Sequence, residues 1–241
     1  MMSGVFDSGI GGMSVIFELR KFRPRADLIY YADKKNCPYG TKSRQEIIRL
    51  VRADIARLRE AGATHALIAC CTASTVYCSL TPAEQKFLTP ILAPTADAAA
   101  AATENGKIGV VCTDATAESG EFERQIKRTR PGAAVYTLPL QSLVREVERM
   151  GLGHSELLCE RSPRQRKKSD PLYKELARMC APLLHTDIDT LVLGCTHFPH
   201  LTGTFSDIFR GVRIVSCARV GAELLADVTD PRGSGLTRII E

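Results

Sequence analysis

Two short apolar segments of this 241-residue chain share one pattern, and each of them ends at a cysteine. Residues 65–70 read His-Ala-Leu-Ile-Ala-Cys, and residues 190–195 read Thr-Leu-Val-Leu-Gly-Cys. Short uncharged aliphatic segments are typical of buried strands in a parallel sheet, whose carboxyl ends meet at one edge. Two such strands, one from each half of the chain, could place two thiols on opposite sides of a ligand. Inversion of a stereocentre needs an acid and a base opposed in this way.

Predicted strands alternate with predicted helices along the chain. The helix that Ser43 caps carries apolar residues at three- and four-residue steps until Gly62, which is the pattern of an amphipathic helix. Alternating units of this kind imply parallel sheets that bind ligands at the carboxyl ends of their strands. The expected strands are residues 3–6, 27–31, 67–70, 107–111, 134–138 and 212–215, together with the segment before Cys195.

The two halves of the chain correspond to each other. Residues 4–6 match residues 109–111, and Cys70 matches Cys195, as expected for a diverged internal duplication. We therefore predict an α/β fold with two pseudosymmetric parallel-sheet domains and an active site in the cleft between them. The first domain is predicted to comprise residues 1–93 and 206–241, and the second residues 94–205.

Composition and the N-terminal sequence narrow the class of protein. Hydrophobic residues make up 44% of the chain and charged residues 24%, close to the average for a soluble globular protein. No apolar segment approaches the ~20 residues of a membrane span, and the N-terminus lacks the basic and hydrophobic parts of a signal peptide. A cytoplasmic location without a membrane partner is therefore expected.

Cysteine spacing and charge exclude further classes. None of the nine cysteines stands in C-x-x-C spacing, so we expect reduced thiols and no metal site. The net charge of +5 derives largely from basic residues 161–168. A solvated surface loop is the favoured interpretation of this segment, because no aromatic residues interleave with the charges as in a nucleic-acid patch.

The first predicted strand runs into a glycine-rich turn, Asp7-Ser8-Gly9-Ile10-Gly11-Gly12. The turn fits neither the dinucleotide fingerprint nor the Walker motif. Its backbone amides and the Ser8 hydroxyl, at the start of a helix, are suited to holding a carboxylate. Asp7 has two possible roles: it could cap this helix, or it could orient or deprotonate a nearby thiol.

Cys70 and Cys195 also allow two interpretations. A cysteine that ends a buried strand more often packs as a small hydrophobe than takes part in catalysis. Cys195, however, is followed closely by His197, and a nearby imidazole or helix N-terminus can lower the pKa of a thiol from about 8.5 toward neutrality. One thiolate could then remove a proton while the opposed thiol donates one.

Four motifs, taken together, resemble those of glutamate racemase, in the aspartate/glutamate racemase superfamily. The motifs are residues 4–12, 38–43, 69–74 and 193–199, and the similarity covers nearly the whole chain in order. The resemblance implies a cofactor-independent racemase that interconverts L- and D-glutamate and supplies D-glutamate for peptidoglycan. It also implies glutamate as the small-molecule substrate, with a homodimer as one possible assembly.

The resemblance also implies roles for single residues. Cys70 and Cys195 would be the two acid/base thiols, with Asp7 supporting Cys70 and His197 supporting Cys195. A glutamate on the mid-chain helix is expected near the second thiol; Glu146 fits this position best, and Glu148 remains an alternative. The residues expected to line the substrate are Asp7, Ser8, Tyr39, Gly40, Cys71, Thr72, Thr196 and His197.

Cys71 departs from the pattern of the family, which usually has Asn there. A thiol is a much weaker hydrogen-bond donor than an amide, and loss of one transition-state donor can cost ~10²–10³ in rate. Two alternatives to glutamate racemisation therefore stay open: a racemase of another acidic amino acid, or a catalytically impaired member with a binding or regulatory role.

Overall fold

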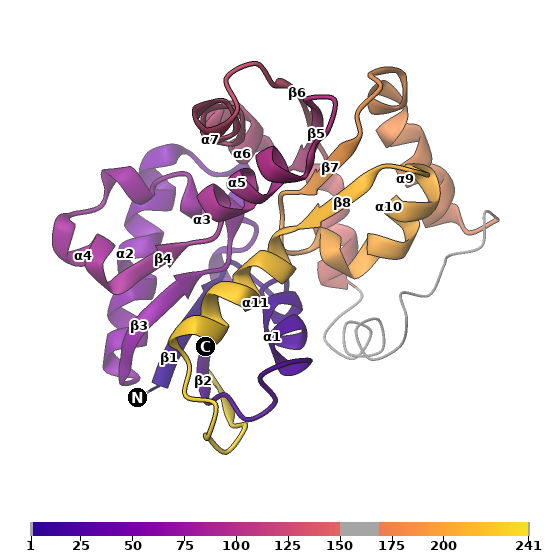
Figure 1. Cartoon of the computed structure of the whole chain (residues 1–241). Coiled ribbons are helices and arrows are strands. Elements are labelled where there is room, and N and C mark those ends of the chain that lie inside the picture. Colours follow the sequence, from indigo (N-terminus) through magenta and orange to yellow (C-terminus); the bar gives the residue numbers. More distant parts are fainter. Residues whose placement is uncertain (1, 150–168, 241) are drawn as a thin grey trace.

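The computed structural model describes residues 2–149 and 169–240, and within them it has two separate parallel sheets (Figure 1). The first sheet has the strand order β4-β3-β1-β2-β9, and the second has the order β6-β5-β7-β8. All adjacent strands pair in parallel, which confirms the predicted α/β class. The strands are β1 (Met2–Asp7), β2 (Leu28–Ala32), β3 (Ala63–Ile68), β4 (Leu88–Pro90), β5 (Lys107–Cys112), β6 (Ala134–Pro139), β7 (Thr190–Leu193), β8 (Arg213–Ser216) and β9 (Thr237–Ile240).

Helices connect the strands and cover the sheets. The expected amphipathic helix is α2 (Arg44–Glu60). The Ser43 side chain caps it by accepting a hydrogen bond from the Glu46 amide, and the helix ends just before Gly62, whose backbone is left-handed. Residues 141–149 are also helical. Besides residues 141–149, the helices are α1 (Met13–Arg20), α2 (Arg44–Glu60), α3 (Cys71–Ser74), α4 (Pro82–Phe87), α5 (Leu92–Ala102), α6 (Asp114–Ser119), α7 (Glu121–Thr129), α9 (Pro171–Cys180), α10 (Thr202–Ile208) and α11 (Cys217–Val228), with short 3-10 turns η1 (Lys34–Asn36), η2 (Tyr39–Thr41), η3 (Tyr77–Ser79), η4 (Ala181–His185) and η5 (Phe198–Leu201).

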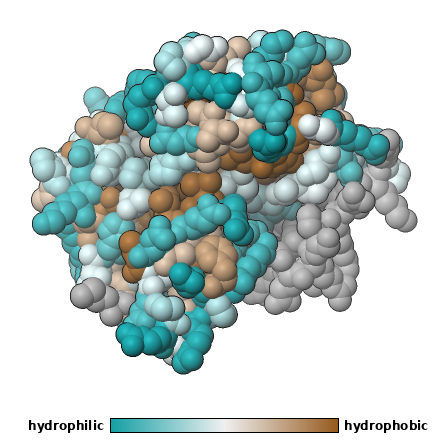
Figure 2. Space-filling view, in the orientation of Figure 1, coloured by the Kyte–Doolittle hydropathy of each residue, from teal (hydrophilic) through white to brown (hydrophobic). Residues whose placement is uncertain are grey.

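The core has three apolar clusters, because each sheet buries both of its faces. In β1, Val5 points into a cluster with α1, α5 and α11, whereas its neighbour Phe6 points into a second cluster with α2. The first of these clusters continues to Val110 and Val192 of the second sheet, so the two domains share one apolar layer. Figure 2 shows hydrophobic side chains on this side of the molecule along the seam between α11 and the region of β4 and α5.

The domain boundary lies later than residue 206. β8 pairs with β7 in register from Thr190–Arg213 to Leu193–Ser216, so residues up to Ser216 belong to the second sheet. The chain returns to the first domain through α11, which packs against α1, and ends as β9 beside β2. The predicted boundary therefore moves by about one helix and one strand, because β8 completes the second sheet before the crossover.

Candidate active site

Cys70 lies directly beyond the carboxyl end of β3, where the chain turns into α3. Its sulfur accepts a hydrogen bond from the Ala73 amide at 3.4 Å and lies 3.9 Å from Oγ of Ser8. Ser8 follows β1, the strand beside β3 in the sheet. The parallel register therefore brings the glycine-rich turn and the first thiol together, as the sequence predicts.

Cys195 occupies the equivalent position in the second sheet, just beyond β7. Its sulfur lies 3.5 Å from Nδ1 of His197. Gly194 lets the ring of Phe122 pack directly on the backbone here, since a Cβ at this position would lie 2.7 Å from that ring. Strand end, glycine and thiol thus form one compact unit, and the imidazole expected beside Cys195 is in place.

Both thiols are protonated in this arrangement. Burial, followed by the Asp7 carboxylate, raises the pKa of Cys70 to about 12. Burial likewise raises the pKa of Cys195 well above its ordinary value, although the His197 backbone amide opposes this shift. The expectation that the imidazole and the helix N-terminus bring a thiol pKa toward neutrality is therefore wrong for this closed state, because desolvation of the thiolate outweighs both.

His197 connects the second thiol to a carboxylate. Its Nε2 lies 2.5 Å from Oε1 of Glu148, which also accepts a hydrogen bond from the Ile10 amide at 2.9 Å. Burial opposes ionisation of Glu148, but the hydrogen bonds that it accepts, first of all the one from His197, outweigh burial and lower the pKa of Glu148. Glu148 accepts a hydrogen bond from Nε2–H, which in a neutral imidazole leaves Nδ1 as an acceptor facing the Cys195 thiol.

The structure places Glu148 rather than Glu146 beside His197. The Glu146 carboxylate instead pairs with Arg149 at 2.7 Å on an exposed part of the same helix, with 40% of its side chain accessible. The two glutamates lie two residues apart, which turns them to different faces of a helix. The prediction that Glu146 lies near the second thiol is therefore wrong, and its alternative, Glu148, occupies that position.

Asp7 bridges the two domains. Its Oδ1 accepts a hydrogen bond from the Thr196 hydroxyl at 2.9 Å, and its Oδ2 accepts one from the Gly9 amide at 3.0 Å. The N-cap of α1 is Gly12 and has no side-chain cap bond, so Asp7 does not cap this helix. Full burial raises the pKa of Asp7, and the hydrogen bonds from Gly9 and Thr196 oppose this shift only in part.

A cluster of hydroxyls lines the cleft beside the first thiol. Oγ1 of Thr72 lies 2.8 Å from that of Thr113 and 3.0 Å from that of Thr116. Thr113 follows β5, so it stands at the same sheet edge as Cys195. Gly40 packs against Thr113, since a Cβ on Gly40 would lie 2.6 Å from Cβ of that residue.

Two predicted substrate-lining side chains point elsewhere. The Tyr39 hydroxyl lies 2.6 Å from Oδ2 of Asp33 and 2.9 Å from Oδ2 of Asp54, so this side chain holds its own loop against β2 and α2. The Cys71 thiol lies within the apolar layer shared by the two domains, hydrogen-bonded to Cys217; that bond, followed by burial, raises its pKa well above the ordinary value. Only the backbone of these residues is left to contact a ligand in the cleft.

The central residues of the site are almost sealed from solvent. The exposed fraction is 0% for Asp7, 5% for Cys70, 6% for Cys195 and 2% for His197. A charged substrate cannot reach the thiols without movement of the domains, so this arrangement is closed. Closure of this kind strengthens electrostatic interactions by removing water.

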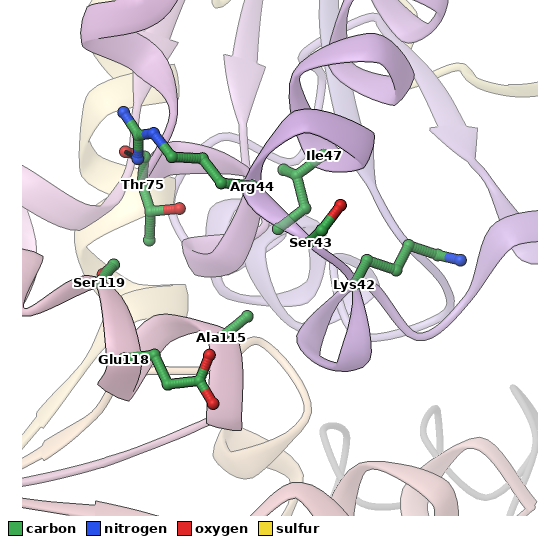
Figure 3. Close-up of a pocket in the computed structure, with 8 residues that line it drawn as sticks. All are labelled: Lys42, Ser43, Arg44, Ile47, Thr75, Ala115, Glu118 and Ser119. Atoms are coloured by element: carbon green, nitrogen blue, oxygen red, sulfur yellow. Dashed lines mark hydrogen bonds between the residues drawn. The ribbon is translucent and has the colours of Figure 1, made fainter.

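Openings remain at two sides of the closed cleft. One is a cavity of about 240 Å³ between the start of α2 and α6, where Arg44 turns its guanidinium toward Thr75 and Glu118 reaches in from the other domain (Figure 3). The other lies beside Glu148 and is also lined by Cys37, whose sulfur is 3.6 Å from the Glu148 carboxylate. Both openings lie between the domains, as expected of the edges of a closing cleft.

Sequence reasoning missed Thr113 and Thr116. Their signal was present, because Cys112-Thr113 follows a predicted strand just as Cys70 and Cys195 do. Cys159 and the basic segment 161–168 lie outside the described residues. Within residues 2–149 and 169–240, no group of three or more His, Cys, Asp or Glu side chains is arranged to hold a metal ion. No helix in that part of the chain is long and apolar enough to cross a membrane.

Comparison with known proteins agrees with this geometry. The family model for Asp/Glu/hydantoin racemases matches residues 16–225. The chain is 35% identical over 207 residues to a glutamate racemase of Picosynechococcus sp., covering 85% of this chain and 68% of that protein. The chain belongs to the glutamate racemase family. It is therefore an amino-acid racemase, a class of isomerase.

Other members of the family extend the similarity to the whole fold. A glutamate racemase of Aquifex aeolicus is 31% identical over 238 residues, covering 98% of this chain and 86% of that protein. The crystal structure of glutamate racemase isoform RacE1 from Bacillus anthracis superposes with a TM-score of 0.79 at 28% identity, covering 94% of this chain and 80% of that one. Escherichia coli glutamate racemase, solved in complex with L-glutamate and the activator UDP-MurNAc-ala, gives a TM-score of 0.72 at 31% identity, covering 93% and 80%.

Proposed function

We propose that this racemase interconverts L- and D-glutamate without a cofactor, using Cys70 and Cys195 as its two acid/base groups. The observation that carries the proposal is the matched position of the two buried thiols, each just beyond a central strand of its own sheet. The Asp7–Thr196 hydrogen bond joins the end of β1, the neighbour of β3, to the segment after β7, so the edges of the two sheets face each other across the cleft. A ligand held between them would meet one sulfur from each domain.

Racemisation removes the proton on one face of the α-carbon and delivers a different proton to the other face. One sulfur, as thiolate, takes the proton from the α-carbon, and the opposed thiol delivers its own proton to the other face. The electron pair of the broken C–H bond stays on carbon and its adjacent carboxylate until the new C–H bond forms. After one turnover the protonation states of the two sulfurs are exchanged, which readies the site for the reverse direction.

The surroundings of the two thiols support different parts of this step. His197 can accept the Cys195 proton at Nδ1, because Glu148 holds the Nε2 proton on the far side of the ring. Cys70 has no imidazole; its neighbours are the Ser8 hydroxyl and the Asp7 carboxylate. Asp7 is suited to bind the ammonium group of the substrate, whose positive charge would favour a thiolate nearby.

Hydroxyls and backbone amides would hold the carboxylates. The donors that support this are the Ser8 and Thr72 hydroxyls and the amides at Gly40 and around Thr72. Glutamate as substrate is supported by the glutamate racemases among the relatives, of which the Escherichia coli protein was crystallised with L-glutamate. The activator in that crystal is UDP-MurNAc-ala, which supports a role in supplying D-glutamate for peptidoglycan.

Single thiol variants test the proposal. We expect Cys70→Ser and Cys195→Ser each to lower the rate of racemisation of both glutamate enantiomers by on the order of 10³-fold, because a serine hydroxyl is a far weaker acid than a thiol. Cys78→Ser is the matched control, since Cys78 is an exposed thiol outside the cleft. Wild-type rates in either cleft variant would refute the two-thiol mechanism. Comparison of glutamate with aspartate then decides which acidic amino acid is the substrate.

A further inference from the structure

The carboxamide of Gln141 is buried without a partner. Both Oε1 and Nε2 are shielded from solvent, and neither has a hydrogen-bond partner. Gln141 follows β6 and Leu140, at the first position of the helical residues 141–149. Buried polar groups in native proteins are normally paired, and an unpaired one calls for an explanation such as a missing ligand.

This amide lies over a substrate-facing loop of the opposite domain. A Cβ added to Gly40 would overlap Oε1 of Gln141, so the amide packs directly on the bare α-carbon of that glycine. Thr113 touches the same point of Gly40, and its hydroxyl lies 2.8 Å from that of Thr72. A continuous line of contacts therefore runs from Gln141 through Gly40 and Thr113 to Thr72, two residues after Cys70.

The two ends of the site differ in charge. The Asp7 carboxylate and the His197–Glu148 pair stand at one end. At the other end, the atoms nearest to the Gly40 position belong to Gln141 and Thr113, which are both uncharged and carry hydrogen-bond donors. An ammonium group is favoured at the first end, and a carboxylate at the second.

We propose that Gln141 determines substrate specificity by donating a hydrogen bond from Nε2 to the side-chain carboxylate of a dicarboxylic amino acid. The inference rests on the proposed function and adds a named contact to it. The thiols act at the α-carbon, and Gln141 is linked to the segment after Cys70 through Gly40, Thr113 and Thr72, as expected of a group that contacts another part of the substrate. Separation of the domains to admit substrate would uncover both amide atoms to water, and closure over the carboxylate would pair Nε2 again.

Binding and turnover of three variants test this assignment. Gln141→Leu keeps the size of the side chain and removes its donor, Gln141→Glu adds a negative charge, and Gln141→Asn keeps a shortened amide. Ser142→Ala is the matched control, because Ser142 is exposed on the same turn and bonds only weakly to Met179. Circular dichroism checks that each variant is folded.

We expect Gln141→Leu to raise KM and the calorimetric Kd for D-glutamate by on the order of 10- to 100-fold, with kcat changed only a few-fold, and Gln141→Glu to raise them further. Exchange of the α-proton of 2-aminobutyrate, which lacks the side-chain carboxylate, should be equal in wild type and Gln141→Leu. An unchanged Kd in folded Gln141→Leu, or no binding by wild type, would overturn the assignment. Wild type that binds D-glutamate through Gln141 without exchanging its α-proton would instead refute the proposed function alone.

Discussion

The Thr196 hydroxyl donates a hydrogen bond to Oδ1 of Asp7 across the domain boundary, at 2.9 Å and out of contact with solvent. Asp7 ends β1 of the first sheet, and Thr196 follows the thiol beyond β7 of the second. One bond thus joins the carboxyl end of a strand in each sheet, next to Cys195 on one side and to Ser8, which lies beside Cys70, on the other.

Removal of the interdomain bond should lower the stability of the protein. Thr196→Val leaves the buried Asp7 carboxylate with one donor fewer, which we expect to lower the free energy of unfolding by about 1–3 kcal/mol. Thr196→Ser keeps the hydroxyl and should stay close to wild type. Chemical denaturation measures the loss, and equal stability of the valine and serine variants would show that the bond contributes nothing.

Glu148 and Glu146 form a matched pair two residues apart. Glu148→Gln should lower kcat by on the order of 10-fold or more, because the amide no longer holds the Nε2 proton of His197 as a carboxylate does. Glu146→Gln breaks an exposed pair with Arg149, away from His197, and should leave kcat unchanged. Steady-state kinetics measures kcat of both variants. A larger loss of kcat in Glu146→Gln than in Glu148→Gln would contradict the structure.

Asp54 makes stability depend on pH. Burial, only partly offset by the hydrogen bond from Tyr39, raises the pKa of Asp54 to about 8 in the folded protein, whereas an unfolded aspartate titrates near pH ~4. A raised folded pKa means that the stabilising contribution is complete below the unfolded pKa and is lost as pH rises through about 8. Asp54→Asn should therefore lose less stability than wild type between pH 5 and 9. Parallel slopes in thermal melts of the two proteins would exclude this titration.

Cys71 should matter more for packing than for catalysis. Its thiol packs with Cys217 in the apolar layer between the domains, so Cys71→Ala should change kcat only a few-fold. Cys71→Asn puts a larger polar amide into that layer and should lower the free energy of unfolding by about 1–3 kcal/mol. Denaturation and initial rates measure both effects. A strong gain of racemase activity in Cys71→Asn would instead favour the impaired, regulatory alternative for the wild type.

The fold and the two thiols follow from sequence because they depend on local patterns. Short aliphatic segments predict strands, parallel strands share one edge, and so Asp7, Cys70 and Cys195 could be expected at a common cleft. The domain boundary could not be placed as well, since whether β8 pairs with β7 or with the first sheet is a long-range choice.

Side-chain direction was the other limit. Sequence alone does not tell which way Tyr39 or Cys71 points, because the partners that hold them, Asp54 and Cys217, come from distant segments. The pKa of each thiol could not be predicted for the same reason. Burial of the thiols depends on closure of the whole cleft, and the effect of burial outweighs that of the neighbouring imidazole and helix start.

The most direct test follows the α-hydrogen of glutamate in deuterated solvent. Wild-type enzyme and L-glutamate should yield D-glutamate that carries deuterium at the α-carbon, while L-glutamate recovered early in the reaction remains protiated. Two separate thiols predict this result, because the proton removed by one sulfur is not the one delivered by the other. Early deuterium in the recovered L-glutamate would point to a single base, and no deuterium in either enantiomer would contradict racemisation by Cys70 and Cys195.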